Sequence, residues 1–544
     1  MKYNFILLFL AAFLSSGSFA LRIRDSNPNI GVFWHFSDIH LDTAYVIENP
    51  NDLWGNYLRD TSLIVAETAI ENAIELAPST EQPDFVIWSG DSAPHNKTLI
   101  QDDVLASISK LSTWFTTTFS LWNNTPVLPI IGEYDLFPVS TISPHPEDHR
   151  REKWCSQLAE EPEYWSTWIR NAAQSVNHVL GLPKAKFNET CYLSLLLPQP
   201  DLPQGPQILL LGLNSIVWYT QNPRLDTTID DPLNQFSWLS GSLQWARENQ
   251  AKVIVVTHLT PGTAELHPQN GQYIHPKYNQ RLVSILRTFA DVIITTLAGH
   301  EHVDGFRVLL SEKFKPIGTV FLGPSIDPII LPDRGDFNPR IRLYHYDRGT
   351  GVLLDYEQFW LNLSTPGPSW HHEYTARADY QDLPDLSPQS MATLLDQFTI
   401  YDNPDGKWSR YWTHQLGYRP HENRPGFHPH GYCHFAFSVC RCEHVCAMRH
   451  LDVDQWNQCV NNYCLTSINP KLPTIWDLSH PRNNMNQMMV ILVTVGVLFL
   501  VTLMATTIAC ISRKRHRIRK GPGERLICRF SDSDGVKMSD VTNG

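Results

Sequence analysis

The chain has 544 residues and a formal net charge of −12, with 42% apolar residues and 17 tryptophans. This length exceeds that of one compact domain, and the apolar content is enough for a large buried core. The negative charge argues against a nucleic-acid binder or a nuclease, because such proteins usually present a basic face.

Residues 1–20, MKYNFILLFLAAFLSSGSFA, combine an early lysine, an apolar run and closing small residues. This pattern predicts a secretory signal peptide that is removed near Ala20, and a short buried helix is the alternative. Four Asn-x-Ser/Thr sequons follow in the part that would be lumenal or extracellular. We expect glycosylation at some of them, which are Asn96, Asn123, Asn188 and Asn362.

From residue 31 to about residue 346, short runs of β-branched and apolar residues recur, with helix-compatible stretches between several of them. The apolar runs predict buried strands: VFWHFSD, DFVIWSGD, VLPIIG, ILLLGLNS, KVIVVTH, DVIITTLAGH, GTVFLG and IRLYHYD. Residues 62–77 and 102–119 are helix candidates. Strands that alternate with helices predict an α/β protein whose helices pack outside the sheet.

From about residue 370 the composition shifts toward Pro, Trp, His and Cys, which predicts a disulfide-tied, mainly helical C-terminal domain. Eight of the ten cysteines precede residue 488, as suits an oxidising compartment. Cys155 and Cys191 lie far from the others and are candidates to pair. The other six are Cys433, Cys440, Cys442, Cys446, Cys459 and Cys464. For these six, disulfides of open connectivity are favoured over a zinc cluster with His434 and His444, because no CxxC…CxxC spacing exists.

Residues 488–511 form about 24 residues of apolar sequence without a charge, which is long enough to span a bilayer. The basic run SRKRHRIRK follows at once, and such a run marks the cytoplasmic side. These features predict a single-pass type I membrane protein with its large part outside the cytosol. We expect residence in the cell membrane, with endolysosomal membranes as the alternative.

Acidic residues and histidines follow the predicted strands, where open α/β sheets hold their functional groups. Each motif alone is weak, because a lone histidine after a strand is usually a core residue and a lone aspartate is usually a turn former. Five such motifs in one order predict a two-metal site with mixed oxygen and nitrogen ligands, which suit zinc, manganese or iron. They are Asp38-x-His40, Gly90-Asp91, Gly132-x-x-Asp135, His258 and Gly299-His300-x-His302.

The ordered motifs resemble those of the calcineurin-like metallophosphoesterases. The segments FWHFSDIHLD, VIWSGDSAPH, VVTHLTPG and LAGHEHVD are similar to the acid sphingomyelinase and acid sphingomyelinase-like phosphodiesterase family, and the resemblance runs from about Gly31 to Cys464. It implies a metallophosphoesterase four-layer α/β/β/α sandwich, followed by the helical, disulfide-rich C-terminal domain. The apolar run of residues 488–511 adds one transmembrane helix to the expected fold.

The resemblance also implies two zinc ions per chain. One ion would be held by Asp38, His40, Asp91 and His302, and the other by Asp91, His258, His300 and a residue of the third motif. His95 matches a family histidine near the substrate phosphate. The alternative for His95 is an ordinary histidine of a surface loop.

The third motif departs from the family pattern, because Glu133 and Tyr134 stand where the family has an asparagine and a histidine. A glutamate oxygen still suits zinc, but its charge makes the site less electrophilic toward an anionic phosphodiester. Protonation of the leaving group by the missing histidine is worth about 10²–10⁴-fold in rate. Tyrosine, with an ordinary pKa of about 10, is a poor acid near neutral pH, so His95 is the candidate replacement.

We therefore expect a membrane-anchored, monomeric, zinc-dependent phosphodiesterase that faces the lumen or exterior and acts on nucleotides or phospholipid head groups. The alternative is an inactive or impaired relative that binds partners at a surface, which Gly132-Glu133-Tyr134 favours. The expected parts are a signal peptide (1–20), a catalytic domain (21–370), a cysteine-rich helical domain (371–465), a stalk (466–487), a transmembrane helix (488–511) and a cytoplasmic tail (512–544).

Overall fold

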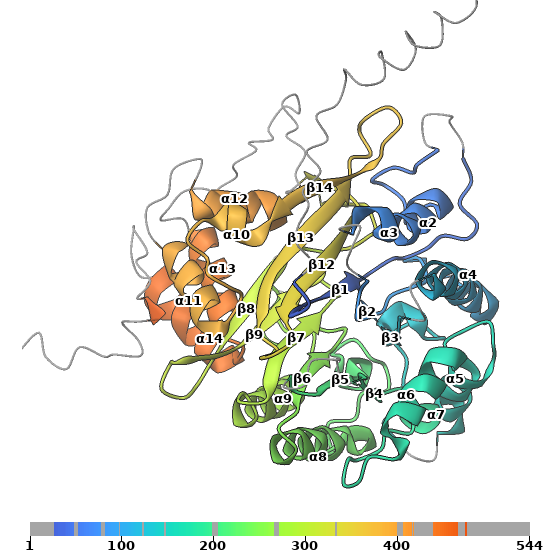
Figure 1. Cartoon of the computed structure of the whole chain (residues 1–544), viewed down its shortest axis with the longest axis horizontal. Helices are drawn as coiled ribbons and strands as arrows, with labels where there is room; N and C mark the ends of the chain where they lie inside the picture. The colour runs from blue at the N-terminus through green and yellow to red at the C-terminus, as the bar shows by residue number, and fades with distance from the viewer. Residues whose placement is uncertain are drawn as a thin grey trace, which may run out of the picture. The chain divides into compact units, whose positions relative to one another are not determined.

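Two six-stranded mixed sheets form the centre of the computed structural model (Figure 1). The structure describes residues 27–47, 53–77, 82–96, 98–121, 125–145, 148–198, 205–265, 271–331, 335–399, 406–415, 417, 439–465 and 474–475. All of them belong to one compact unit that comprises residues 1–479. The predicted α/β architecture is confirmed.

The first sheet has the strand order β14-β13-β12-β1-β2-β3. Its strands are β1 (Ile30–Phe36), β2 (Phe85–Trp88), β3 (Val127–Pro129), β12 (Arg340–Asp347), β13 (Leu353–Leu361) and β14 (Trp370–Thr375). β1, β2 and β3 are parallel, whereas β12 to β14 are antiparallel. Phe33 of β1 stacks on Phe85 and on Tyr344, so the register also aligns buried aromatic rings across three strands.

The second sheet has the order β4-β5-β6-β7-β9-β8. Its strands are β4 (Leu193–Leu196), β5 (Ile208–Gly212), β6 (Lys252–Val256), β7 (Ile293–Ala298), β8 (Gly305–Leu310) and β9 (Pro316–Leu322), and β10 (Ile329–Leu331) pairs separately with β11 (Gly335–Phe337). The two large sheets pack face to face. At their interface, the ring of Phe321 in β9 makes T-shaped contacts with Tyr344 in β12 and Tyr356 in β13. A Cβ at Gly212 would lie 2.7 Å from Ile130 Cγ2, so the close approach of the sheets requires glycine there.

Helices cover the outer faces of both sheets. They are α2 (Leu63–Glu71), α3 (Ala73–Leu76), α4 (Gln101–Ser120), α5 (His149–Glu160), α6 (Ser166–Asn177), α7 (Phe187–Thr190), α8 (Gln235–Glu248) and α9 (Pro276–Thr288). On the first sheet, Phe115 of α4 packs against Phe36 and Trp88. On the second sheet, α8 contacts β6 and α9 contacts β9. The layers thus follow one another as helix, sheet, sheet and helix.

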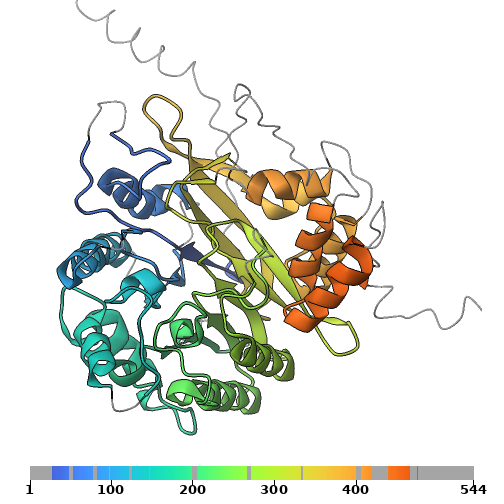
Figure 2. The same ribbon diagram turned by 180° about the vertical axis from the view of Figure 1, so that it is seen from behind.

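The C-terminal region is helical and is tied by disulfides, as predicted. Its helices are α10 (Ala376–Tyr380), α11 (Pro388–Gln397), α12 (Lys407–Gln415), α13 (Val439–Arg449), α14 (Val453–Cys459) and a π-helix (Val460–Cys464). α11 and α13 pack against β8, and Figure 2 shows this group on the opposite side of the sheets from α4 to α6. The predicted boundary between residues 370 and 371 stays a prediction.

Three disulfides are formed among the described cysteines: Cys155–Cys191, Cys442–Cys464 and Cys446–Cys459. The first confirms the predicted pairing of the two isolated cysteines. Cys440 is also disulfide-bonded, while Cys433 and His434 lie outside the described residues. The zinc-cluster alternative is wrong for the described cysteines, because their thiols are consumed in these bonds.

The prediction of a single-pass type I protein that resides in the cell membrane, or in endolysosomal membranes, is wrong for the part of the chain that the structure describes. Among the residues that the structure describes, no helix combines the length and the apolarity that a bilayer crossing requires. The longest described helix, α4, has 20 residues but carries Asp102, Asp103 and Lys110. The predicted signal peptide, transmembrane segment and tail lie outside the described residues, as does the stalk apart from residues 474 and 475.

Candidate metal centre

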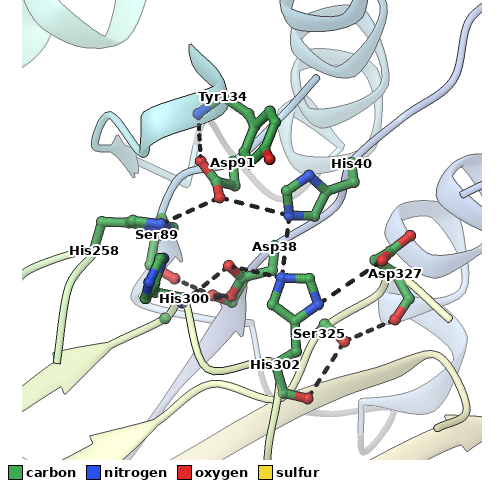
Figure 3. Close-up of polar contacts among 12 residues, drawn as sticks. Asp38, His40, Ser89, Asp91, Tyr134, His258, His300, His302, Ser325 and Asp327 are labelled. Atoms are coloured by element: carbon green, nitrogen blue, oxygen red, sulfur yellow. Dashed lines mark hydrogen bonds and ion pairs between the residues drawn. The ribbon is translucent and has the colours of Figure 1, made fainter. Parts of the chain in front are cut away.

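The motifs that follow the strands meet in one buried cluster between the two sheets (Figure 3). The loops after β1, β2 and β3 supply one half, and the loops after β6 and β7 supply the other. Parallel strands bring their carboxyl ends to the same edge of a sheet, which explains why distant motifs meet. The cluster contains all seven predicted metal ligands, which are Asp38, His40, Asp91, Glu133, His258, His300 and His302.

The ligand atoms fall into groups that share Asp91. Asp38, His40 and Asp91 form one group, and Asp91, Glu133, His258 and His300 form another; within each group the ligand atoms lie within 4.8 Å of one another. His302 joins the first group, because its Nε2 lies 3.2 Å from His40 Nε2 and 3.6 Å from Asp38 Oδ1. The structure thus brings the predicted ligands close together, and their division between two ions stays a prediction.

The chemistry of these side chains fits a pair of divalent cations. His40 Nδ1 lies 2.9 Å from the carbonyl of Ala93, and His258 Nδ1 lies 2.8 Å from the carbonyl of Ser89. In the neutral imidazoles, an N–H at each Nδ1 would leave the Nε2 lone pair facing the cluster, which is the arrangement of metal-ligating histidines. His258 Nε2 and Glu133 Oε2 lie 2.8 Å apart inside the protein, and a cation would satisfy both.

Burial sets the protonation of several ligands. It lowers the pKa of His40 and of His302 well below the ordinary value, and the neighbouring His95 acts in the same direction. Both imidazoles are therefore neutral, as metal binding requires. Burial raises the pKa of Asp38 to about 7. A bound cation would favour the ionised form of that carboxyl.

Five of the seven predicted ligands have a left-handed backbone. Their φ angles are 49° for Asp38, 45° for His40, 57° for Asp91, 69° for His300 and 59° for His302. Non-glycine residues rarely adopt this conformation, and it persists at functional sites when the surroundings hold it in place. This concentration of strained residues marks the cluster as functional independently of the residue types.

Glu133 bridges the two histidines of the second group. Its Oε1 lies 2.8 Å from His300 Nδ1, and its Oε2 lies 2.8 Å from His258 Nε2. Burial raises the pKa of Glu133, but the charges of the two imidazoles outweigh this effect and hold that pKa well below the ordinary value. The carboxylate is therefore ionised and occupies the position predicted for a ligand.

Tyr134 contributes both its backbone and its ring. Its backbone N–H donates to Asp91 Oδ1 over 2.8 Å, and its ring meets the rings of His40 and His95 edge-on. Burial raises the pKa of the phenol above its ordinary value. The hydroxyl therefore stays protonated and is suited to donating a hydrogen bond.

His95 lies beside the cluster, stacked on His40 with 3.7 Å between ring centroids. Its Nδ1 is 2.5 Å from Asp60 Oδ1, and its backbone N–H donates to Asp60 Oδ2 over 3.1 Å. Asp327 Oδ2 lies 3.9 Å from the same nitrogen. Burial lowers the pKa of His95, but the Asp60 hydrogen bond and the Asp327 charge outweigh it and raise that pKa to about 9. The structure therefore places His95 next to the cluster, and its role toward a substrate stays a prediction.

Sequence reasoning missed Asp60 and Asp327 and assigned Asp135 only to the turn. Asp135 Oδ2 accepts hydrogen bonds from the backbone of Gly132 and Asp91, and its Oδ1 accepts one from Ser92. It therefore joins the loops after β2 and β3. The fixed Gly-x-x-Asp spacing was a signal for Asp135, whereas no local pattern separates Asp60 or Asp327 from ordinary turn residues.

The predicted glycosylation sites differ in exposure. Asn96 and Asn188 are exposed and Asn362 is half-buried, while Asn123 lies outside the described residues. Their modification stays a prediction.

Two family models match the chain. Residues 31–304 match the calcineurin-like phosphoesterase model, and residues 315–466 match the acid sphingomyelin phosphodiesterase C-terminal region. The first match contains all seven clustered ligands.

Curated relatives match over most of their lengths. The acid sphingomyelinase-like phosphodiesterase 3b of Homo sapiens is 29% identical over 82% of this chain and 93% of its own. The cyclic GMP-AMP phosphodiesterase SMPDL3A of Homo sapiens is 30% identical over 70% of this chain and 82% of its own. The sphingomyelinase phosphodiesterase C of Dictyostelium discoideum is 28% identical over 72% and 87%. A solved purple acid phosphatase from yellow lupin gives a TM-score of 0.32 at 11% identity over 64% of this chain and 53% of its own, too low a score to support an argument.

Proposed function

The chain belongs to the calcineurin-like phosphoesterases, within the group that carries the acid sphingomyelin phosphodiesterase C-terminal region, and we propose that it hydrolyses phosphodiesters of nucleotides or phospholipid head groups. One observation carries the proposal: six of the predicted ligands form two groups that share Asp91, and His302 lies beside the first group, 3.2 Å from His40. Relatives are named as a cyclic GMP-AMP phosphodiesterase and a sphingomyelinase phosphodiesterase, which supports phosphodiesters as the substrate class.

We assign zinc to both groups, because histidine nitrogens and carboxylate oxygens are ligands that zinc accepts. The ions would be held by Asp38, His40, Asp91 and His302, and by Asp91, Glu133, His258 and His300. When bound, such a pair supplies Lewis acidity and a lowered pKa of bound water.

His95 is the proposed proton donor to the leaving oxygen. Asp60 holds its Nδ1, which leaves Nε2 as the nitrogen that can serve a substrate. The ring of Tyr134 lies next to that of His95, so its protonated hydroxyl is placed to hydrogen-bond a phosphoryl oxygen. In this arrangement His95 performs the acid role that Tyr134 cannot perform.

Glu133 makes the proposed enzyme slower rather than inactive. The carboxylate keeps contact with both His258 and His300 at 2.8 Å, which supports its role as a ligand. It also adds a negative charge within the cluster, and that charge opposes the approach of an anionic phosphodiester. Retained metal binding with modest turnover follows from these two effects.

The test uses purified protein loaded with zinc and a panel of a nitrophenyl phosphodiester, a cyclic dinucleotide and a phosphocholine lipid. We expect two zinc ions per chain and turnover that Asp91→Ala abolishes, because Asp91 belongs to both groups. Two bound ions without turnover on any diester would instead favour a metal-binding protein without catalysis. Restored turnover in Glu133→Asn/Tyr134→His would then identify the third motif as the cause.

A further inference from the structure

The loop after β7 has its acidic residues turned away from the metal ligands. His300 and His302 face the cluster, whereas Glu301 and Asp304 pair with the buried arginines Arg307 and Arg342. The Glu301 Oε1 to Arg307 Nη2 distance is 2.5 Å. Glu301 is 6% exposed and Arg307 is fully buried. The residue between the two histidine ligands is therefore fixed by an ion pair inside the protein.

This ion pair is connected to the C-terminal helices. Arg307 Nη1 donates to the carbonyl of Ala447 in α13 over 3.2 Å. The second oxygen of Glu301 accepts a hydrogen bond from the backbone N–H of Glu265 over 3.1 Å. A displacement of α13 would therefore act on Glu301 through Arg307.

Glu265 is fully buried and makes a second connection to the same helices. Its carboxylate accepts hydrogen bonds from Tyr411 (2.8 Å) and Gln415 (2.7 Å) of α12, and it lies 3.1 Å from His444 Nδ1 of α13. A buried carboxylate needs such partners because it has left water. α12 and α13 thus provide the partners of the Glu265 carboxylate, and the backbone N–H of Glu265 donates a hydrogen bond to Glu301.

The strained backbone of the two ligands explains why they need this support. His300 and His302 have φ angles of 69° and 59°, which cost free energy and persist only where neighbouring contacts hold them. Partners that orient metal ligands from outside typically change metal affinity by about 10–100-fold when they are replaced. Glu301 is the residue that is adjacent to both ligands.

We propose that Glu301, Arg307 and Glu265 form a positioning unit through which helices α12 and α13 hold His300 and His302 in metal-binding geometry, so that the C-terminal region sets the metal affinity of the site. This inference rests on the proposed metal site. Glu301 touches no substrate in this role and acts through its neighbours on the chain.

The decisive variant is Glu301→Gln/Arg307→Met. Removing both partners takes out one buried positive and one buried negative charge together, and the glutamine oxygen keeps the hydrogen bond from Glu265. The control is Asp84→Asn/Arg348→Met, which removes a partly exposed ion pair with a 2.8 Å contact, just before β2 and just after β12. Cobalt titration of the protein, followed by visible absorption, measures affinity and also reports the ligand geometry around the ion.

We expect the Glu301/Arg307 variant to bind cobalt about 10–100-fold more weakly at one or both sites, with shifted absorption bands, and the control to match the wild type. A folded variant with wild-type affinity and spectrum would overturn the inference. Tyr411→Phe removes one hydroxyl donor to Glu265 without any charge change. If the double variant does not fold, the cobalt affinity of Tyr411→Phe tests the inference instead. A several-fold loss of affinity is expected there, and an unchanged affinity counts against the role of α12. If the wild type binds no cobalt, the proposed metal site fails first and this inference falls with it.

Discussion

Asp60→Asn tests the assignment of His95 as the proton donor. Asp60 offers two acceptor oxygens to two donors of His95, the ring Nδ1 at 2.5 Å and the backbone N–H at 3.1 Å. Asparagine offers one acceptor oxygen, so one of these hydrogen bonds is lost whichever way the amide turns. A hydrogen bond to a charged group is worth about 1.5–3 kcal/mol, which corresponds to about 10–100-fold in rate.

Partial solvent exposure of the His95 and Asp60 side chains reduces the expected loss of rate. The His95 side chain is 36% exposed and that of Asp60 is 21% exposed, so solvent screens the interaction and the lower end, about tenfold, is expected. The assay compares kcat for an alkyl phosphodiester, whose leaving oxygen needs a proton, with kcat for a nitrophenyl phosphodiester, whose leaving group needs little help. Only the alkyl substrate should lose rate. An equal loss on both substrates would refute the role of the Asp60–His95 pair in proton donation.

Three further outcomes are expected. Glu133→Asn/Tyr134→His should raise kcat on the alkyl substrate at least about tenfold, because it adds an acid and removes a charge, and an unchanged kcat would count against the third motif as the limiting feature. Replacing both Cys155 and Cys191 by serine should lower the free energy of unfolding by about 4 kcal/mol in urea titrations, since the disulfide closes a loop with a sequence separation of 36. Burial, reinforced by the charge of Arg449, lowers the pKa of His450 to about 3. Below about pH 6.5 the unfolded chain therefore binds a proton at His450 that the folded chain does not bind. Between pH 6.5 and 4.5 the wild type should therefore lose about 2 kcal/mol more stability than His450→Gln, and parallel losses would contradict this assignment.

The apolar runs predicted eight strands, and the structure has a strand in each. The strands that the sequence did not reveal are β4, β8, β13 and β14, together with the short β10 and β11. β13 and β14 carry exposed or half-buried polar residues at several positions, among them Asp355, Glu357, His371 and His372. Their apolar signal is therefore diluted, because strands with one partly solvated face alternate instead of forming continuous apolar runs.

The amino-acid sequence by itself determined the ligand types and their order, because metal ligands are limited to a few side chains and follow strand ends at fixed spacings. It also determined the altered third motif, since the sequence itself has Glu133 and Tyr134 where the family has an asparagine and a histidine. Only the tertiary structure decided what surrounds these ligands. Asp60 and Glu265 lie far in sequence from His95 and Glu301, the residues they orient. Arg307 likewise connects Glu301 to the distant Ala447, and no local spacing records a contact between distant segments. Burial in the folded chain then gives these contacts their strength, because a charge removed from water must be paired.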